Sequence, residues 1–327
     1  MKAIVIREYG GPDVLELREV PDPVAGPEDV LVRVRAAGVN RADLLERRGL
    51  YPPPPPRPPL EIPGLEFAGE VLEAGERTAG FSPGDRVLGI TAAGAYAEKV
   101  AIHHRLLTRL PDGLDWPEAA ALPEAFVTAA DALAQAELRP GESVLIHAVG
   151  SGVGSAAVQV ARAWGAKPII GTARTPAKLE AARSLGLDVG IHAGSGDFAA
   201  VAQQATGGQG VDVIVDFVGA AYLEANLEAL AIGGRMIVVG MLGGARGTLD
   251  LSAMLMKRLR VIGTTLRARP LEGKAAAMRL FERAVLPFVV DGRIRPVVDR
   301  TFALADAAAA HRYMESNANF GKIVLAI

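Results

Sequence analysis

Short apolar runs separated by glycine and proline fill the first hundred residues of the chain. In the stretch 30–35, VLVRVR, charged and apolar residues alternate, which is the period of a strand with one buried face. We expect these strands to form a twisted antiparallel sheet or a partial barrel. They are predicted at residues 2–7, 14–20, 30–36, 67–74, 85–90 and 96–102.

Near residue 123 the pattern changes to alternating strands and helices. Apolar runs long enough for buried strands occur at 143–149, 167–172, 188–192, 211–218, 235–240 and 260–265. Helices are predicted between them at 152–164, 176–185, 198–205 and 221–231. Six parallel strands joined by crossover helices predict an α/β fold with a doubly wound sheet.

The remaining C-terminal stretch is too short for a third domain. It contains predicted helices at 274–290 and 305–315 and a final strand at 322–327. We expect it to return to the first domain. The predicted domains are therefore 1–122 with 266–327, and 123–265.

A proline-rich segment interrupts the first domain, with prolines at 52–56, 58 and 59. Proline has a fixed φ and no amide donor, so the segment predicts a stiff extended loop. One interpretation is an exposed surface linker. We favour a loop wrapped on the domain, because apolar segments continue on both sides.

Composition narrows the possible chemistry. The chain has 327 residues, half of them apolar, and no cysteine. Disulfides, thiolate nucleophiles, iron–sulfur clusters and cysteine-ligated zinc are therefore excluded. The net charge of −2 argues against nucleic acid or an anionic membrane as a partner. Only 7 of the 35 basic residues are lysine, which together with 22 prolines favours a thermophilic or GC-rich source.

One uncharged window, residues 144–161, has the length of a candidate membrane span. It also holds a histidine, two serines, a glutamine and three closely spaced glycines, so a strand, a turn and a helix describe it better. The first residues, MKAIVIRE, do not have the pattern of a signal peptide. We expect a soluble cytoplasmic protein.

A glycine-rich turn joins the first strand of the α/β region to its helix. The turn residues are Gly150, Ser151, Gly152, Val153 and Gly154. Glycines here let the backbone approach a pyrophosphate, and the helix N-terminus supplies free N–H groups and the positive end of its dipole. This placement predicts a dinucleotide site. The alternative is a glycine turn without a ligand.

The end of the second strand indicates which dinucleotide binds. Reading a ribose 2′-hydroxyl requires Asp or Glu about 20 residues past the glycine turn. The sequence from Thr172 and Ala173 onward has no acid there, but it has Arg174 and Lys178. Lys178 lies in a first helical turn, where the helix dipole disfavours a cation. We predict that both cations bind the 2′-phosphate of NADPH; the alternative is two solvated surface charges.

These motifs resemble the medium-chain dehydrogenase/reductase superfamily, in its zinc-free, zeta-crystallin-like quinone oxidoreductase branch. In the AxxGxxG turn of that branch, Ser151 takes the place of the middle glycine. The resemblance extends over nearly the whole chain. The matching stretches are 38–43, 63–69, 81–87, 148–154, 165–167, 212–219, 233–235 and 320–324.

The resemblance implies a GroES-like partial β-barrel domain, a Rossmann domain and an active site in the cleft between them. Zinc-dependent members of the superfamily carry a cysteine and a histidine where this chain has Asn40 and Leu65. No metal site is therefore expected. His103, His104 and His147 are interpreted as surface or packing residues, because adjacent histidines in a strand face opposite ways.

The resemblance also implies roles for residues outside the glycine turn. Asn40 and Asp43 are expected on the nicotinamide side, and Tyr51 is either a substrate hydrogen-bond donor or a loop anchor. The ends of the fourth and fifth strands border the cofactor crevice. The other expected cofactor contacts are Thr128, His192, Phe217, Val218, Gly240, Met241, Leu242, Phe320 and Lys322.

The predicted function is metal-free hydride transfer from NADPH to a quinone. A close alternative is an NADPH-dependent alkenal or enoyl reductase, which reduces a C=C bond conjugated with a carbonyl. An alternative of another class is a non-catalytic NADPH-binding protein with a structural or RNA-binding role. The resemblance further implies a homodimer formed through the edge strand at 260–265.

Overall fold

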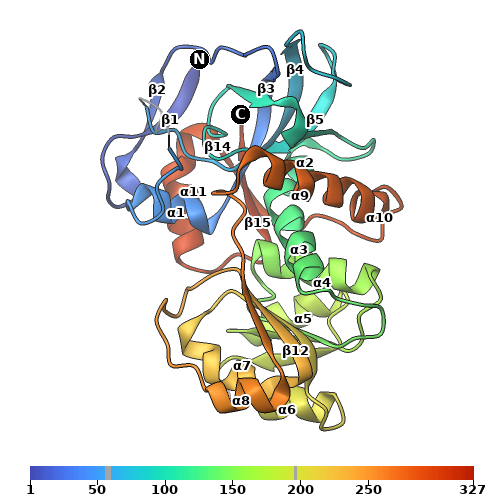
Figure 1. Cartoon of the computed structure of the whole chain (residues 1–327). Coiled ribbons are helices and arrows are strands. Elements are labelled where there is room, and N and C mark those ends of the chain that lie inside the picture. Colours follow the sequence, from blue (N-terminus) through green and yellow to red (C-terminus); the bar gives the residue numbers. More distant parts are fainter. Residues whose placement is uncertain (56–59, 195–196) are drawn as a thin grey trace. The chain divides into compact units, whose positions relative to one another are not determined.

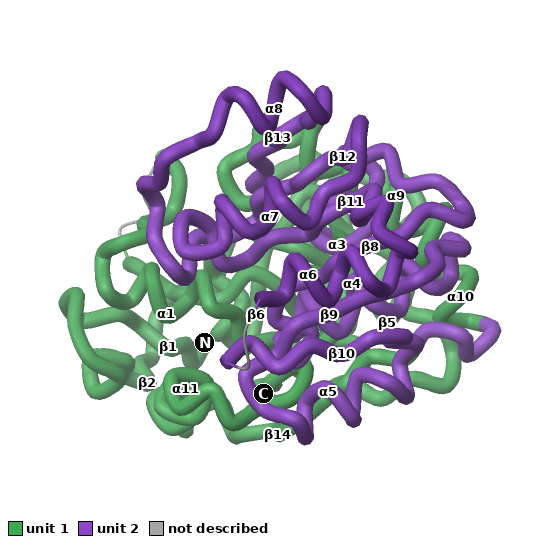
Figure 2. Tube along the Cα trace, turned by 90° about the horizontal axis from the view of Figure 1, so that it is seen from below, with its two compact units in different colours: residues 1–127, 266–290, 295–327 green, residues 128–265, 291–294 purple. Residues whose placement is uncertain are grey.

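The computed structural model describes residues 1–55, 60–194 and 197–327, and the chain divides into two compact units (Figures 1 and 2). Unit 1 comprises Met1–Val127, Leu266–Val290 and Arg295–Ile327, and unit 2 comprises Thr128–Thr265 and Asp291–Ile294. Helix α3 (Pro123–Gln135) begins in unit 1 and continues in unit 2. The division therefore falls inside this helix, a little later than the predicted boundary after residue 122.

Unit 2 is built on one parallel sheet. Its strands are β8 (Val144–Ile146), β9 (Ile169–Ala173), β10 (Val189–His192), β11 (Val211–Asp216), β12 (Leu230–Val238) and β13 (Arg260–Gly263). They lie in the order β10-β9-β8-β11-β12-β13, and every neighbouring pair is parallel. The predicted doubly wound sheet is confirmed. Its strand order reverses between β8 and β11, which defines a crevice outside their carboxyl ends.

Helices cover both faces of this sheet. Those after the first strands are α4 (Gly152–Ala163), α5 (Pro176–Arg183) and α6 (Phe198–Ala205), close to their predicted bounds. The expected helix at 221–231 is instead a 3-10 turn, η3 (Ala220–Tyr222), followed by α7 (Leu223–Ala229). Helix α8 (Leu251–Lys257) was not predicted. Figure 1 shows α6, α7 and α8 together on one face, where they share a core with the strands.

The buried side chain of His147 links four elements of unit 2, namely β9, α6, η3 and α7. The Nδ1 atom of His147 lies 3.0 Å from Thr172 Oγ1, and its Nε2 atom lies 2.7 Å from Asn226 Oδ1. Its ring also packs edge-on against Phe198 and Tyr222. Burial lowers the pKa of His147 to about 4, so the ring is neutral at pH 7. His147 is the packing residue that the sequence predicted.

Unit 1 contains a seven-stranded sheet around one long central strand. Its members are β3 (Asp29–Val39), β4 (Glu66–Ala74), β5 (Arg86–Ile90), β6 (Lys99–His103), β7 (Leu107–Arg109), β14 (Val298–Ala303) and β15 (Lys322–Ala326). Strand β3 pairs with β4, β6 and β15, always antiparallel. The C-terminal strand therefore returns to the first domain, as predicted, and brings Lys322 beside the end of β3.

The N-terminal strands do not join this sheet, contrary to the prediction. Strands β1 (Lys2–Ile6) and β2 (Leu15–Glu19) form a separate antiparallel pair. It is attached by a bridge between Ala3 and Ala97 and by small apolar contacts. Alternating polar and apolar residues predict that a strand has one buried face, but they do not specify which sheet the strand joins.

Several helices of unit 1 also escaped prediction. They are α1 (Arg41–Arg47), α2 (Trp116–Ala120) and the start of α3. Helices α2 and α3 are rich in alanine and mostly buried, so apolar periodicity does not mark one face. The expected helix at 274–290 is two helices, α9 (Leu271–Ala284) and α10 (Leu286–Val290). The remaining elements are α11 (Ala307–Glu315) and the 3-10 turns η1 (Pro12–Val14), η2 (His104–Leu106) and η4 (Leu304–Asp306).

The proline-rich segment is described only up to Pro55, and residues 56–59 lie outside the described part of the chain. Within the described part, Pro53 is buried and Pro55 is exposed. The carbonyl oxygen of Tyr51 accepts a hydrogen bond of 2.7 Å from Arg267 Nη1. The start of the loop thus packs on unit 1, as expected for a wrapped loop.

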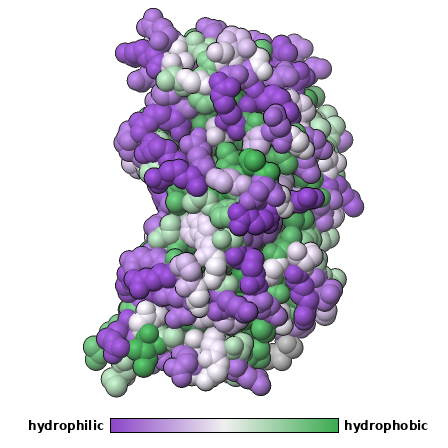
Figure 3. Space-filling model, turned by 90° about the vertical axis from the view of Figure 1, so that its right-hand side faces the viewer, coloured by the Kyte–Doolittle hydropathy of each residue, from purple (hydrophilic) through white to green (hydrophobic). Residues whose placement is uncertain are grey.

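Polar and apolar side chains are interspersed over the face that Figure 3 shows. Among the described residues, no helix combines the length and the apolar character needed to cross a bilayer. The window 144–161 is a strand, a turn and the first part of α4, as predicted.

Candidate functional site

The glycine-rich turn of unit 2 is shaped by one steric constraint. A Cβ atom on Gly154 would lie 2.2 Å from the carbonyl oxygen of Ala148, so no side chain fits there. Ala148 itself has a φ of 51°, which lies in the left-handed region. Ser151 is the N-cap of α4, and its Oγ accepts a hydrogen bond of 3.0 Å from the Gly154 amide. Ser151 therefore stabilises the turn by capping α4.

The first amides of α4 are available to a ligand. For the N–H groups of Gly152 and Val153 there is no acceptor among residues 1–55, 60–194 and 197–327, and both residues are partly exposed. Free amides and the positive end of the helix dipole together favour a phosphate. Gly150, Ser151, Gly152, Val153 and Gly154 thus fit the pyrophosphate of a dinucleotide.

Arg174, Lys178 and His192 lie together beyond the ends of β9 and β10. Arg174 is exposed, and its carbonyl oxygen lies 2.9 Å from His192 Nε2. Lys178 packs against the glycine turn, since a Cβ on Gly150 would lie 2.6 Å from Lys178 Cδ. The structure thus places Lys178 beside the turn and Arg174 directly after β9, with no carboxylate between Ala173 and Lys178.

The Thr172 side chain lies beneath the glycine turn, in the interior of unit 2. Its hydroxyl lies 3.0 Å from His147 Nδ1 and accepts a bond of 3.3 Å from the Ala148 amide, and the residue is buried. Its side chain faces the interior of unit 2 because β9 alternates between the two faces of the sheet. Thr172 therefore supports the glycine turn from beneath, and neighbouring Ala173 is also buried.

The loops after β11 and β12 pair with each other. The Leu242 amide donates to the Phe217 carbonyl at 3.2 Å, and the Gly243 amide donates to the Val218 carbonyl at 2.7 Å. Met241 and Leu242 leave 60% and 61% of their surfaces exposed. Phe217, Val218, Gly240, Met241 and Leu242 thus lie at the carboxyl edge of the sheet, as predicted. Thr128 opens the part of α3 that belongs to unit 2 and is half-buried.

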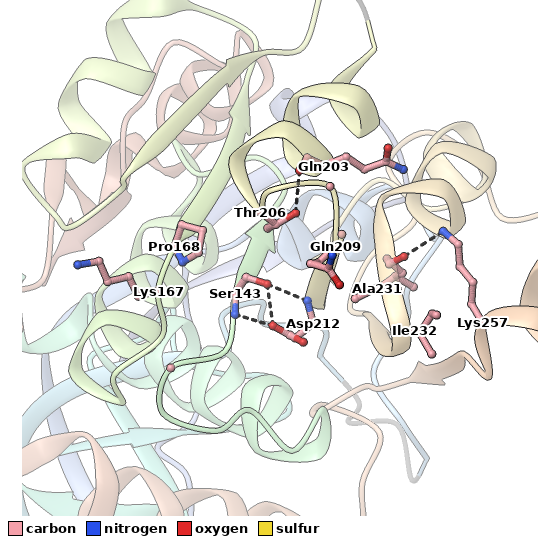
Figure 4. Close-up of a pocket in the computed structure, with 14 residues that line it drawn as sticks. Ser143, Lys167, Pro168, Gln203, Thr206, Gln209, Asp212, Ala231, Ile232 and Lys257 are labelled. Carbon is pink, nitrogen blue, oxygen red and sulfur yellow. Dashed lines mark hydrogen bonds between the residues drawn. The ribbon is translucent and has the colours of Figure 1, made fainter.

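A pocket of about 570 Å³ lies at the opposite edge of the same sheet (Figure 4). Its lining residues begin the strands: Ser143 precedes β8, Lys167 precedes β9, and Asp212 lies at the start of β11. The polar groups here bond to one another. Ser143 Oγ donates to Asp212 at 2.8 Å, and Lys257 Nζ donates to the Leu230 carbonyl at 3.0 Å. This pocket is distinct from the edge that carries the glycine turn.

In unit 1 a buried ammonium group organises the residues around Asn40. Lys322 Nζ lies 2.9 Å from the Val39 carbonyl, 2.6 Å from Asn40 Oδ1 and 2.5 Å from Glu66 Oε1. Asn40 Nδ2 donates in turn to Glu66 Oε1 at 2.8 Å. Both ends of the Asn40 amide are therefore held, and its rotation is fixed.

Glycine and helix geometry make room for this cluster. A Cβ on Gly38 would lie 2.3 Å from Glu66 Oε1, so only glycine leaves space for the carboxylate. The second oxygen of Glu66 accepts a bond of 2.8 Å from the Glu124 amide, at the start of α3. The Glu66 carboxylate thus ties β4 to β15, to the end of β3 and to α3.

Asp43 belongs to a second buried group on α1. Its Oδ2 accepts bonds from the Asn40 amide at 2.7 Å and from the Tyr96 hydroxyl at 2.8 Å. The Tyr96 hydroxyl also lies 3.4 Å from His311 Nε2. Burial raises the pKa of Asp43 to about 6 and lowers that of His311 to about 3. The His311 ring is therefore neutral at pH 7.

A third group joins Glu46, Arg267 and Tyr51. Arg267 Nη2 donates to Glu46 Oε2 at 2.6 Å, and its guanidinium lies 5.1 Å from the centre of the Tyr51 ring. Burial raises the pKa of Glu46 to about 8 despite the opposing charge of Arg267. Tyr51 is thus placed against Arg267, which favours its interpretation as a loop anchor.

The structure brings together Asn40, Asp43 and Lys322. The Phe320 amide donates a hydrogen bond of 3.0 Å to Asp299 Oδ1. Glu66, Tyr96 and Glu124 were not predicted as site residues from the sequence. Glu66 lies in the stretch 63–69, which carries the family resemblance but assigns no role to this residue. Glu124 is an acid in an otherwise apolar stretch, ALPEAFV, and that is the signal that could have identified it.

Metal ligation was tested on the side chains. In the described part of the chain no three histidine or acidic side chains come together as metal ligands. Asn40 stands where the resemblance places a zinc-binding cysteine in zinc-dependent members, and its side-chain oxygen accepts a hydrogen bond from the Lys322 ammonium group. His103 and His104 were expected to face opposite ways, and this prediction is wrong. Strand β6 ends at His103 and the chain turns, so the two rings stack with their centres 4.8 Å apart.

Family models match both parts of the chain. An alcohol dehydrogenase GroES-like domain matches residues 26–112, and a zinc-binding dehydrogenase model matches residues 152–283. A quinone oxidoreductase of Pseudomonas aeruginosa is 35% identical over 330 residues, which cover 99% of each chain. A spectinabilin polyketide synthase protein of Streptomyces orinoci is 38% identical over 97% of this chain, which spans 14% of that protein's length.

Solved structures agree with this assignment. A structure described as an NAD-dependent alcohol dehydrogenase superimposes with a TM-score of 0.90 at 35% identity and covers all of both chains. A mycobacterial protein in complex with NADPH gives a TM-score of 0.87 at 30% identity, again with full coverage of both chains. The fold, the glycine turn and these full-length matches show that the chain is an oxidoreductase of the medium-chain dehydrogenase/reductase superfamily and belongs to its quinone oxidoreductase branch.

Proposed function

We propose that this protein is an NADPH:quinone oxidoreductase that works without a metal ion. The observation that carries the proposal is the buried Lys322 ammonium group, which binds three oxygen atoms around Asn40 and Glu66. A metal ion at this point would have to displace a cation that already neutralises Glu66. The family membership supports hydride transfer as the reaction class.

A site of this kind favours an electron-poor acceptor. Oxidising an alcohol requires removal of its hydroxyl proton, which a metal ion assists as a Lewis acid. A quinone already has polarised carbonyl groups and needs no such activation. The nicotinamide cofactor, when bound, supplies the hydride, and the protein supplies binding and orientation.

The cofactor roles follow from the described geometry. The amides of Gly152 and Val153 bind the pyrophosphate, while Arg174 and Lys178 bind the 2′-phosphate. The loops after β11 and β12 line the crevice. Asn40, held rigid by Lys322 and Glu66, orients the nicotinamide side. The NADPH complex of the mycobacterial relative supports this cofactor.

A panel of acceptors tests the reaction. With NADPH as the donor, we expect 1,4-benzoquinone and 9,10-phenanthrenequinone to be reduced with a higher kcat/KM than a 2-alkenal, because a quinone is the more electron-poor hydride acceptor. Steady-state NADPH oxidation measures this. A clear preference for the alkenal would assign the protein to the alkenal and enoyl reductases instead.

A double variant tests the cofactor assignment. Arg174→Ala with Lys178→Ala should weaken NADPH binding by at least roughly 100-fold, since two charge-assisted contacts together contribute about 3 kcal/mol or more. The Kd for NADH should change little. The control variant is Arg183→Ala, at an exposed residue of α5, the helix that also contains Lys178; its Kd values for NADPH and NADH should both change little. Fluorescence titration measures each Kd. Equal affinity of the unmodified protein for NADPH and NADH would refute the assignment.

We also propose a homodimer that forms along the edge of β13. This strand has one neighbour in its sheet, and its residues Arg260, Val261 and Gly263 are exposed. Leu255 and Met256 of nearby α8 leave 76% and 72% of their surfaces exposed. Such an apolar edge is expected to pair with a second copy.

Sedimentation velocity at micromolar concentration should therefore give the mass of two chains. Leu255→Asp should shift the distribution toward one chain, while Leu17→Asp, an exposed leucine on β2, should not. A single-chain mass for the unmodified protein would show the dimer proposal to be wrong.

A further inference from the structure

Glu124 lies at the border of the buried cluster of Asn40, Glu66 and Lys322, and its carboxyl group has no partner among the described residues. It is the second residue of α3, and its own amide donates to Glu66 Oε2 at 2.8 Å. The Glu124 carboxyl group makes no hydrogen bond or ion pair with any residue of the described ranges. Its neighbours Pro123 and Ala125 are buried, whereas Glu124 keeps part of its surface exposed. Glu124 is therefore not sealed from solvent.

Charged groups from five elements face this carboxyl group. Glu66 on β4 and Asp43 on α1 disfavour its ionisation, while Lys322 on β15 and Arg267 after β13 favour it. Lys274 on α9 is the fifth, with its own pKa lowered by burial. Burial and then Glu66 dominate, and they raise the pKa of Glu124 to about 8. The group is therefore mostly protonated at pH 7.

Exposure to solvent distinguishes Glu124 from the other acids of unit 1 whose pKa values are raised. Burial also raises the pKa of Glu46 to about 8 and that of Asp43 to about 6. Both of those residues are fully buried, and both are bonded, to Arg267 and to Tyr96 respectively. Among these three acids, Glu124 alone combines an available proton with access to solvent.

We propose that the Glu124 carboxyl group is the acid that protonates the reduced acceptor. This proposal rests on the proposed quinone reduction. A hydride brings two electrons and one proton to the quinone, which leaves a negative charge on one oxygen. The O–H bond of Glu124 breaks, and an O–H bond forms on that oxygen to give the hydroquinone. The Glu124 carboxylate then regains a proton from water, and the site is restored.

The protonation state can be measured without any turnover. Infrared spectra of the ligand-free protein should contain a protonated-carboxyl band that disappears near pH 8. Glu124→Gln should remove the Glu124 part of this band and leave the part from Glu46. The exposed Glu76→Gln provides the matched control and should leave the band intact. An unchanged band in Glu124→Gln would overturn the proposal.

The kinetic test separates proton donation from binding. With NADPH and 1,4-benzoquinone, kcat should fall above about pH 8 in the unmodified protein, because Glu124 loses its proton. Glu124→Gln should lower kcat by about 100-fold, within the usual range for a general acid, and should abolish this pH dependence. The KM for NADPH should stay the same, and Glu76→Gln should behave like the unmodified protein.

A conservative variant guards against a folding artefact. Glu124→Asp keeps a carboxyl group on a shorter side chain. It should therefore recover part of kcat, and its kcat should again fall at high pH, which Glu124→Gln should not show. Wild-type kcat and pH dependence in Glu124→Gln would show the proposal to be wrong. Absence of quinone reduction in the unmodified protein would instead contradict the proposed function, while the infrared titration would still report whether Glu124 holds a proton.

Discussion

The arrangement of unit 1 depends on one buried ion pair, between Lys322 and Glu66. Lys322 comes from the last strand of the chain and Glu66 from the start of β4, so their contact closes the sheet around the end of β3. Loss of either partner would leave an uncompensated buried charge, which costs about 3–5 kcal/mol. The same pair fixes both ends of the Asn40 amide. Stability and the geometry of the site therefore share one cause.

Unit 2 has a different requirement, which is to leave backbone N–H groups available to an anion. The doubly wound strand order creates the crevice, and Gly154 allows α4 to begin against the carbonyl of Ala148. Ser151 completes the turn from within by capping the helix. The amides of Gly152 and Val153 remain available, and Lys178 packs against the same turn. Cofactor binding thus needs few side chains, which explains why a short glycine motif is informative.

The sequence predicted the parallel sheet almost strand for strand, because buried strands between turns leave a strong apolar signal. Through the family resemblance it also marked Asn40, Asp43 and Lys322 as site residues, and the structure brings these three together. It failed where tertiary contacts decide the outcome. Strands β1 and β2 left the main sheet, and apolar periodicity did not mark one face of the alanine-rich helices α2 and α3. The partners Glu66, Tyr96 and Glu124 come from separate elements, and no local pattern links them.

The central claim is that a lysine ammonium group occupies the place of a catalytic cation. The most direct test is the zinc content of protein produced in zinc-supplemented medium, measured together with quinone reduction before and after treatment with 1,10-phenanthroline. The account predicts far less than one zinc ion per chain and the same rate after chelation. One zinc ion per chain, with activity lost on chelation and restored by zinc, would contradict it.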